Sequence, residues 1–215
     1  MSDLRSAIES ETDVIVIAEA GVNHNGDEAI AHKLIDAAVH SGAQFVKFQT
    51  FNPELLVAPK ADATRYQKER GASSQSDLLS ALALPASAWE RLRDHAADAG
   101  IGFLSTPFDL PSARVLIDLG VDGLKLSSGE LTNLGFLRDI AAFGVPMLVS
   151  TGMGTADEVL QAADACAAAP FLAFFHCVSA YPAPEDECNL LAIPALRAAT
   201  GVPVGWSDHT TGVDS

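Results

Sequence analysis

Residues 123–130 read GLKLSSGE, and this short segment is the starting point for predicting both the fold and the site. Lys125 stands in an otherwise apolar strand, and two serines, a glycine and Glu130 follow where that strand ends. A lysine inside a buried strand is strongly destabilising unless an anion neutralises it. Two partners fit the segment: an anionic ligand at the C-terminal end of the strand, or Glu130 in a structural ion pair.

Six other apolar segments have the length and composition of buried strands. Together with residues 123–128, the predicted strands cover residues 14–21, 42–50, 101–108, 145–152, 171–179 and 202–209. Helix-sized segments separate them, and this alternation predicts a parallel α/β sheet covered on both faces. The spacing fits a (β/α)₈ TIM barrel that is incomplete, with about seven strands present. The alternative is a doubly wound open sheet, but no GxGxxG phosphate loop follows any of the strands.

The predicted domain organisation is a disordered leader over residues 1–13 and a partial TIM-barrel catalytic domain over residues 14–215. A closed barrel of this kind takes about 250 residues, and the eighth strand is missing here. The chain is a fragment, a partner completes the barrel, or the sheet keeps an open edge that invites association. A truncated sequence is the interpretation that we adopt.

Composition narrows the class of protein. The hydrophobic share of 48% is enough for a globular core, and the formal net charge of −15 disfavours nucleic acid as a partner. The sequence contains no apolar stretch of about 20 residues and begins with polar, acidic residues, which predicts no membrane partner and a cytoplasmic location. The three cysteines form no CxxC pair and are odd in number, as expected of reduced core thiols. Four cations fall within residues 59–70, a segment that could help to hold an anion but that we interpret as solvated surface.

Every predicted strand is followed by polar residues. In chain order the candidates are Glu19, His24, Lys47, Gln49, Thr106, Lys125, Ser128, Glu130, Ser150, His176, Ser179, Tyr181, Ser207 and His209. Since the active site of such a barrel forms at the C-terminal ends of its strands, we expect these residues to converge. The set predicts an anion site with acid–base or metal chemistry beside it.

The residue types suggest separate tasks within this set. A phosphate or carboxylate is bound by cations together with hydroxyl and backbone N–H donors, which the two lysines and the serines could supply, although each serine alone also fits a helix cap or a turn. Glu19 and Glu130 could orient a water molecule or a metal-bound water, or form salt bridges with the lysines. His209 could ligate a divalent metal or be a hydrogen-bonded structural histidine.

Eight motifs occur in an order that resembles the N-acetylneuraminate (sialic acid) synthase family. They are IAEAGVNHNGD, GAQFVKFQTF, SSQSDLL, FLSTPFD, LKLSSGEL, STGM, HCVSAYPAP and GWSDHTTG, and they span residues 14–212. The resemblance implies a C–C bond-forming transferase that condenses phosphoenolpyruvate with the open-chain aldehyde of an N-acylated amino sugar, such as N-acetylmannosamine. The implied products are a nine-carbon 2-keto acid and phosphate, and the implied cofactor is Mn²⁺ or Mg²⁺.

The resemblance also implies roles for individual residues. Those that look like the phosphoenolpyruvate site are Lys47, Lys125, Ser128, Ser150, Ser179 and Ser207, and Gln49 and Thr106 are further candidates for substrate binding. Glu19 and Glu130 resemble the carboxylates near the metal and the attacking water, and Tyr181 resembles the sugar-contacting tyrosine. His209 resembles one of two metal histidines, and the family implies a homodimer.

Three departures from the family pattern leave the substrate and the activity open. Ser179 stands where some sialic acid synthases have Asn, which leaves open a legionaminic or pseudaminic type of product, and Trp206 stands where Tyr is usual. The second metal histidine and the C-terminal antifreeze-like domain are absent from this sequence. The alternatives are a related phosphoenolpyruvate-dependent sugar-phosphate synthase, or a truncated, non-catalytic anion-binding barrel that pairs with a full-length subunit.

Overall fold

The computed structural model describes residues 4–10, 14–56 and 75–212. The chain divides into two compact units, one formed by Thr12–Asp122 and the other by Leu4–Glu11 with Gly123–Ser215. Residues 59–70, with their four cations, lie outside the described residues. Where the chain is described, no helix combines the length and apolar character needed to cross a membrane.

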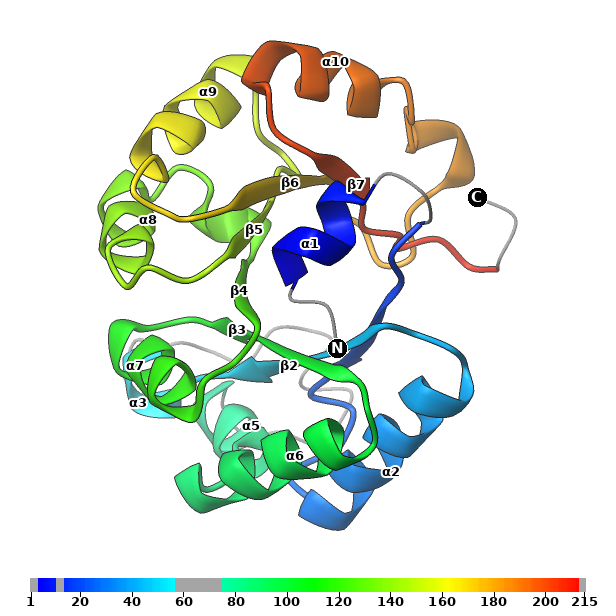
Figure 1. Cartoon of the computed structure of the whole chain (residues 1–215), viewed down its shortest axis with the longest axis vertical. Helices are drawn as coiled ribbons and strands as arrows, with labels where there is room; N and C mark the ends of the chain where they lie inside the picture. The colour runs from blue at the N-terminus through cyan, green and yellow to red at the C-terminus, as the bar shows by residue number, and fades with distance from the viewer. Residues whose placement is uncertain (1–3, 11–13, 57–74, 213–215) are drawn as a thin grey trace. The chain divides into compact units, whose positions relative to one another are not determined.

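The first unit is built from three parallel strands and the helices between them. The strands are β1 (Ile17–Gly21), β2 (Phe45–Thr50) and β3 (Gly102–Pro107), and the helices are α2 (Glu28–His40), α3 (Pro53–Leu56), α5 (Gln75–Leu82), α6 (Ala86–Asp98) and α7 (Leu110–Leu119). β2 pairs with β1 on one side and with β3 on the other. Helices α2, α6 and α7 pack against this sheet (Figure 1).

The second unit repeats the pattern with four parallel strands. These are β4 (Gly123–Leu126), β5 (Met147–Ser150), β6 (Leu172–His176) and β7 (Val204–Trp206), connected through η1 (Ser128–Glu130), α8 (Leu134–Ala141), α9 (Ala156–Ala165), η2 (Glu185–Glu187) and α10 (Ala192–Thr200). Each strand pairs with the next one along the chain. Within both units the spatial order follows the chain without the reversal of a doubly wound sheet, as a barrel requires.

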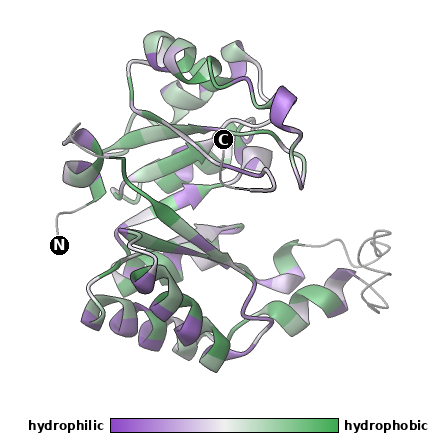
Figure 2. Ribbon diagram, turned by 90° about the vertical axis from the view of Figure 1, so that its right-hand side faces the viewer, coloured by the Kyte–Doolittle hydropathy of each residue, from purple (hydrophilic) through white to green (hydrophobic). Residues whose placement is uncertain are grey.

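Local sequence explains where the helices begin. The Asp27 carboxylate accepts hydrogen bonds from the backbone N–H groups of Ala29 and Ile30, at 2.7 and 3.2 Å, and so caps α2. Thr155 caps α9 in a reciprocal capping box with Glu158. The helices carry polar stripes beside apolar ones, whereas most strand residues are apolar (Figure 2). This pattern matches helices that cover a buried sheet.

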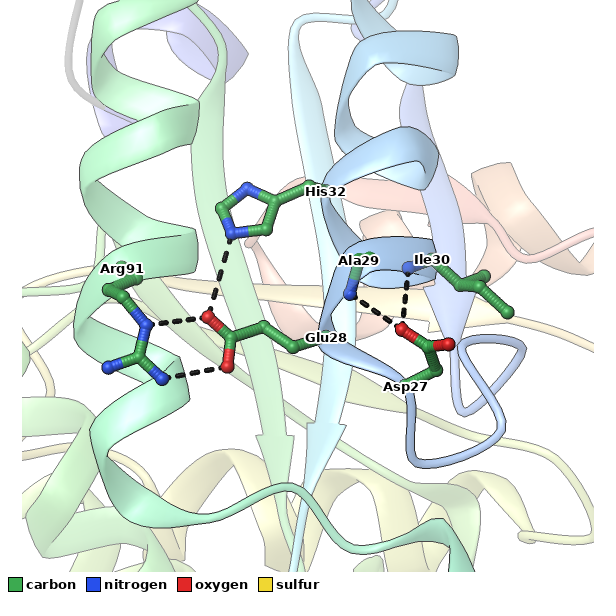
Figure 3. A network of polar contacts seen from close by, with 6 residues as sticks. All are labelled: Asp27, Glu28, Ala29, Ile30, His32 and Arg91. Atoms are coloured by element: carbon green, nitrogen blue, oxygen red, sulfur yellow. Dashed lines mark hydrogen bonds and ion pairs between the residues drawn. The ribbon is translucent and has the colours of Figure 1, made fainter.

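Helices α2 and α6 are joined by a surface network (Figure 3). Arg91 donates two hydrogen bonds to the Glu28 carboxylate, from Nε at 2.6 Å and from Nη2 at 2.7 Å, while His32 Nε2 lies 3.7 Å from the same group. The hydrogen bond from Arg91 lowers the pKa of Glu28. On the same helix, the side chains of Trp89 and Leu92 are buried in the core.

The strands are in general shorter than predicted, and two predicted segments differ most from the structure. Leu4–Glu9 forms helix α1, so the predicted disordered leader is wrong over these residues. Leu4 is only 1% exposed, because its side chain packs over Gly123 at the start of β4. The last strand is shorter than the predicted residues 202–209, because β7 ends at Trp206. His209 lies in the loop that follows, and its backbone carbonyl accepts a hydrogen bond from the Ala183 N–H.

Candidate active site

In the first unit, four predicted residues lie on the neighbouring strands β1, β2 and β3. The strand register places Glu19 opposite Lys47 and Gln49 opposite Thr106. Lys47 is buried, forms an ion pair with Glu19, and has its Nζ 3.4 Å from Thr106 Oγ1. The salt-bridge alternative is therefore what the structure has for Glu19, and this pairing explains how a cation is tolerated inside β2.

Gly21 makes room for this ion pair. Its φ of +52° lies in the left-handed region, and a Cβ built on it would come within 3.0 Å of Glu19 Oε1. The pairing of β1 with β2 is irregular between Glu19 and Gly21. A side chain at Gly21 would thus strain the backbone and displace the carboxylate. No sequence motif had indicated a role for this glycine.

In the second unit, Lys125 is held at the end of β4. Its side chain is buried, and Nζ donates to Ser150 Oγ on β5 and, at 3.5 Å, to the Leu126 carbonyl. The ammonium also lies 5.3 Å from the centre of the Phe175 ring, within cation–π range. The Glu130 carboxylate accepts a hydrogen bond from Asn133 Nδ2 at 2.8 Å. Lys125 and Ser150, predicted for the same task, are therefore in direct contact.

A second group of hydroxyls surrounds Gly152, just after β5. Ser128 Oγ accepts a hydrogen bond from the Gly152 N–H at 3.0 Å and lies 3.3 Å from Cys177 Sγ. A Cβ built on Gly152 would collide with Ser179 Oγ and lie 2.8 Å from Ser128 Oγ. Ser128 and Ser179 thus border the same small space. Cys177, which the sequence analysis placed in the core, borders it too, although no sequence signal distinguished it from the other two buried cysteines.

His209 and Tyr181 form the third group. The His209 ring lies on the Tyr181 ring with 4.2 Å between their centres, and its Nε2 is 3.3 Å from both Tyr181 Oη and Ser207 Oγ. His209 Nδ1 is 2.6 Å from the Val178 carbonyl. Since a carbonyl only accepts hydrogen bonds, Nδ1 carries the proton and Nε2 presents its lone pair.

This tautomer fits His209 to a metal-ligand role. Metal-ligating histidines are neutral and commonly hold their second ring N–H with a carbonyl or carboxylate, as His209 does through Val178. Within the described part of the chain, no three or more His, Cys, Asp or Glu side chains form a metal-binding group. The described residues therefore supply one ligand that suits a divalent cation, not a complete coordination sphere.

Two histidines expected among the polar strand ends serve the packing instead. His24 is 1% exposed, and its ring lies near those of Phe48 and Trp89. Burial lowers the pKa of His24, so that its imidazole is neutral at neutral pH. His176 contacts the Trp206 ring, and its Nε2 lies 2.8 Å from the Cys188 carbonyl. The three cysteines are free and buried, as predicted.

Comparison with known proteins gives consistent matches. Curated relatives include the N,N'-diacetyllegionaminic acid synthases of Campylobacter jejuni and Legionella pneumophila, both 42% identical. The alignments cover 93% and 92% of this chain, but only 61% and 58% of the two relatives. The chain thus spans about six-tenths of the length of these relatives. Both are named as acid synthases.

A solved structure extends the comparison to the fold. The N-acetylneuraminic acid (sialic acid) synthetase of Leptospira borgpetersenii, determined in complex with citrate, is 32% identical and matches with a TM-score of 0.84. The match covers 94% of this chain and 67% of that one, and it confirms the predicted fold class, an incomplete (β/α)₈ barrel. The NeuB family model matches residues 34–215. The resemblance noted from the sequence motifs is therefore confirmed, and the chain belongs to the NeuB family.

Proposed function

We propose that the chain is the catalytic barrel of a nonulosonic acid synthase. It would condense phosphoenolpyruvate with the open-chain aldehyde of an N-acylated amino sugar, giving a nine-carbon 2-keto acid and phosphate. The observation that carries the proposal is buried Lys125, whose Nζ contacts the Ser150 hydroxyl at the end of a β-strand. An ammonium with a hydroxyl beside it is a donor set for a phosphate or carboxylate.

We assign the binding of phosphoenolpyruvate to two lysines and four serines, which are Lys47, Lys125, Ser128, Ser150, Ser179 and Ser207. Gln49 and Thr106 would contribute to substrate binding. Lys125 and Lys47 would hold the substrate's negative charge while it redistributes during the reaction, which is the usual role of fixed charges in a catalytic site. The hydroxyls would orient the phosphoryl and carboxylate oxygens.

The proposed reaction forms one C–C bond and breaks one C–O bond. The C3 carbon of phosphoenolpyruvate attacks the aldehyde carbon, whose oxygen becomes a hydroxyl by taking up a proton. Water then adds to the cationic C2, and loss of phosphate from the resulting tetrahedral carbon leaves the 2-keto acid. Glu19 and Glu130 would orient this water and accept its proton, and Tyr181 would contact the sugar.

A divalent cation belongs to the same proposal. His209 would hold Mn²⁺ or Mg²⁺ through Nε2, and the bound cation would supply Lewis-acid polarisation of the aldehyde oxygen. The support from this chain is the hydrogen bond between His209 Nδ1 and the Val178 carbonyl, which in the neutral imidazole makes Nε2 the nitrogen that can ligate a cation. We also propose a homodimer, as the family resemblance implies, and a cytoplasmic location.

For the sugar, we propose an N,N'-diacetylated acceptor. The support is the 42% identity to two relatives that are both named N,N'-diacetyllegionaminic acid synthase. Ser179 and Trp206, where sialic acid synthases have other residues, are consistent with an acceptor different from N-acetylmannosamine.

Phosphate release tests the proposal directly. The purified protein is incubated with phosphoenolpyruvate and Mn²⁺, together with N-acetylmannosamine or with its dideoxy diacetamido relatives, and the product is identified by mass spectrometry. We expect phosphate and a nine-carbon 2-keto acid, formed fastest with a diacetamido sugar and abolished by a chelator. Absence of phosphate release with every sugar, from a protein whose circular dichroism shows a folded state, contradicts the enzymatic function.

A further inference from the structure

The hydroxyl of Ser128 is engaged from two sides by groups outside the predicted set. The backbone N–H of Gly152 donates to Ser128 Oγ at 3.0 Å, and Cys177 Sγ lies 3.3 Å from the same oxygen. A serine hydroxyl has one proton to donate and two lone pairs to accept with. Gly152 takes up one lone pair, so the thiol of Cys177 determines how the proton and the second lone pair are used.

Two hydrogen-bond arrangements are possible between these side chains. If Ser128 donates to the sulfur of Cys177, its proton is turned away from a bound anion. If the Cys177 S–H donates to Ser128 Oγ instead, both lone pairs are occupied and the hydroxyl proton can point to the anion. The second arrangement also polarises the Ser128 O–H bond, because hydrogen bonds in a chain strengthen one another.

Because Gly152 has no side chain, the hydroxyl of Ser128 and the thiol of Cys177 have room to lie beside each other. A Cβ at this position would lie 2.8 Å from Ser128 Oγ and 3.0 Å from Cys177 Sγ, and closer still to Ser179 Oγ. The φ angle of Gly152 is outside the left-handed region, so the glycine is required for space and not for its backbone conformation.

We propose that Cys177 and Gly152 are positioning residues for the anion site. The Cys177 thiol directs the Ser128 hydroxyl toward the bound phosphoryl or carboxylate group. Gly152, by lacking a side chain, leaves the space in which the Ser128 and Ser179 hydroxyls border the site. This inference deepens the proposed function and rests on it. It gives Cys177 a role that Cys166 does not share. Cys166 is a buried thiol at the end of α9, and burial raises its pKa to about 11.

The test measures phosphoenolpyruvate affinity by calorimetry in the absence of sugar, so that no turnover occurs. Cys177→Ala removes the donor, and we expect the dissociation constant to rise about five- to tenfold, the effect of one hydrogen bond. Cys177→Ser supplies a hydroxyl donor, and we expect it to recover most of the affinity. Cys166→Ala is the matched control, because it truncates a buried thiol of the same unit and should leave the affinity unchanged.

Gly152→Ala tests the second half of the proposal. We expect its affinity to fall on the order of a hundredfold, because the new methyl group displaces the hydroxyls that border it. Gly135→Ala is the control: this helix α8 glycine has no atom within 4 Å of the built Cβ. Thermal denaturation of each variant establishes that the fold persists.

The outcomes distinguish this inference from the proposed function. Binding by the wild type, with weaker binding by Cys177→Ala and recovery by Cys177→Ser, supports the positioning role. Equal affinity in wild type and Cys177→Ala, or a Cys177→Ser variant as weak as Cys177→Ala, overturns it while the proposed function stands. A wild type that does not bind phosphoenolpyruvate overturns both.

Discussion

At the scale of single residues, the position of Lys125 is the clearest link between stability and binding. Its ammonium is buried at the end of β4 and contacts the Ser150 hydroxyl and the face of Phe175. A buried ammonium interacts strongly with an anion, and under the proposed function Lys125 and the Ser150 hydroxyl together would bind the anionic substrate.

Replacing Lys125 should therefore abolish most of the binding. For Lys125→Ala we expect a loss of about 2–3 kcal/mol in the binding free energy of phosphoenolpyruvate, the contribution of a charge-assisted hydrogen-bond pair. Calorimetry measures the change, with Lys33→Ala on the exposed surface of α2 as the control for the loss of one positive charge. Unchanged binding by Lys125→Ala would mean that the lysine is structural.

The neutral imidazole of His24 predicts how stability changes with pH. Burial lowers its pKa in the folded state below the value of about 6.5 that it has in the unfolded chain. The unfolded state then binds more protons as the pH falls below this value, so the stabilising contribution is complete above it and is lost at lower pH.

We expect the urea midpoint of unfolding to decrease between pH 7 and pH 5.5, and to decrease less in His24→Leu. The free energy of unfolding should fall by up to about 1.4 kcal/mol per pH unit for a group that stays fully deprotonated in the folded state. His40→Gln, which changes an exposed histidine at the end of α2, is the control and should keep the wild-type slope. Equal slopes in wild type and His24→Leu would show that His24 does not carry this dependence.

At the scale of elements, helix α1 is the main difference between prediction and structure. Its sequence, LRSAIE, is only six residues long, which is too short for intrinsic helix propensity to form a stable helix in water. The helix exists because Leu4 is buried over Gly123, where any larger residue would collide with the leucine. Arg5 adds an i, i+4 ion pair with Glu9. Tertiary packing, not intrinsic propensity, therefore explains α1.

Removing the Leu4 side chain should destabilise the second unit. For Leu4→Ala we expect a loss of about 2–5 kcal/mol in the free energy of unfolding, from lost burial and the cavity left behind. Denaturant unfolding measures it, and hydrogen exchange should locate the loss in β4 and its neighbours. Leu160→Ala, at a leucine of α9 that is 40% exposed, should cost far less. A similar small cost for both variants contradicts a packing role for α1.

Other elements were predictable because their signals are local. Asp27 and Thr155 cap α2 and α9 through hydrogen bonds to residues that follow them within one turn, so the sequence alone marks both helix starts. The end of β7 was not predictable in the same way. His209 leaves the strand direction to bond the Val178 carbonyl, a partner 31 residues earlier in the chain.

At the scale of the whole molecule, the alternation of apolar strands with helix-sized segments determines the α/β class. Continuous apolar strands such as β5, which is buried throughout, need cover on both faces. The polar residues that follow the strands were likewise evident in the sequence, since strand ends are marked by the change from apolar to polar residues. Eight ordered motifs then led to the family, which the comparisons confirmed.

The sequence by itself determined the class of fold, the family and the residue types available to a site, because these depend on composition, periodicity and motif order along the chain. Only the tertiary structure decided that Lys47 pairs with Glu19, that Lys125 contacts Ser150, and that His24 belongs to the packing. It also decided that Cys177 borders Ser128. The physical reason is that hydrogen bonds, ion pairs and burial depend on distances between residues far apart in the sequence, which side-chain chemistry alone does not specify.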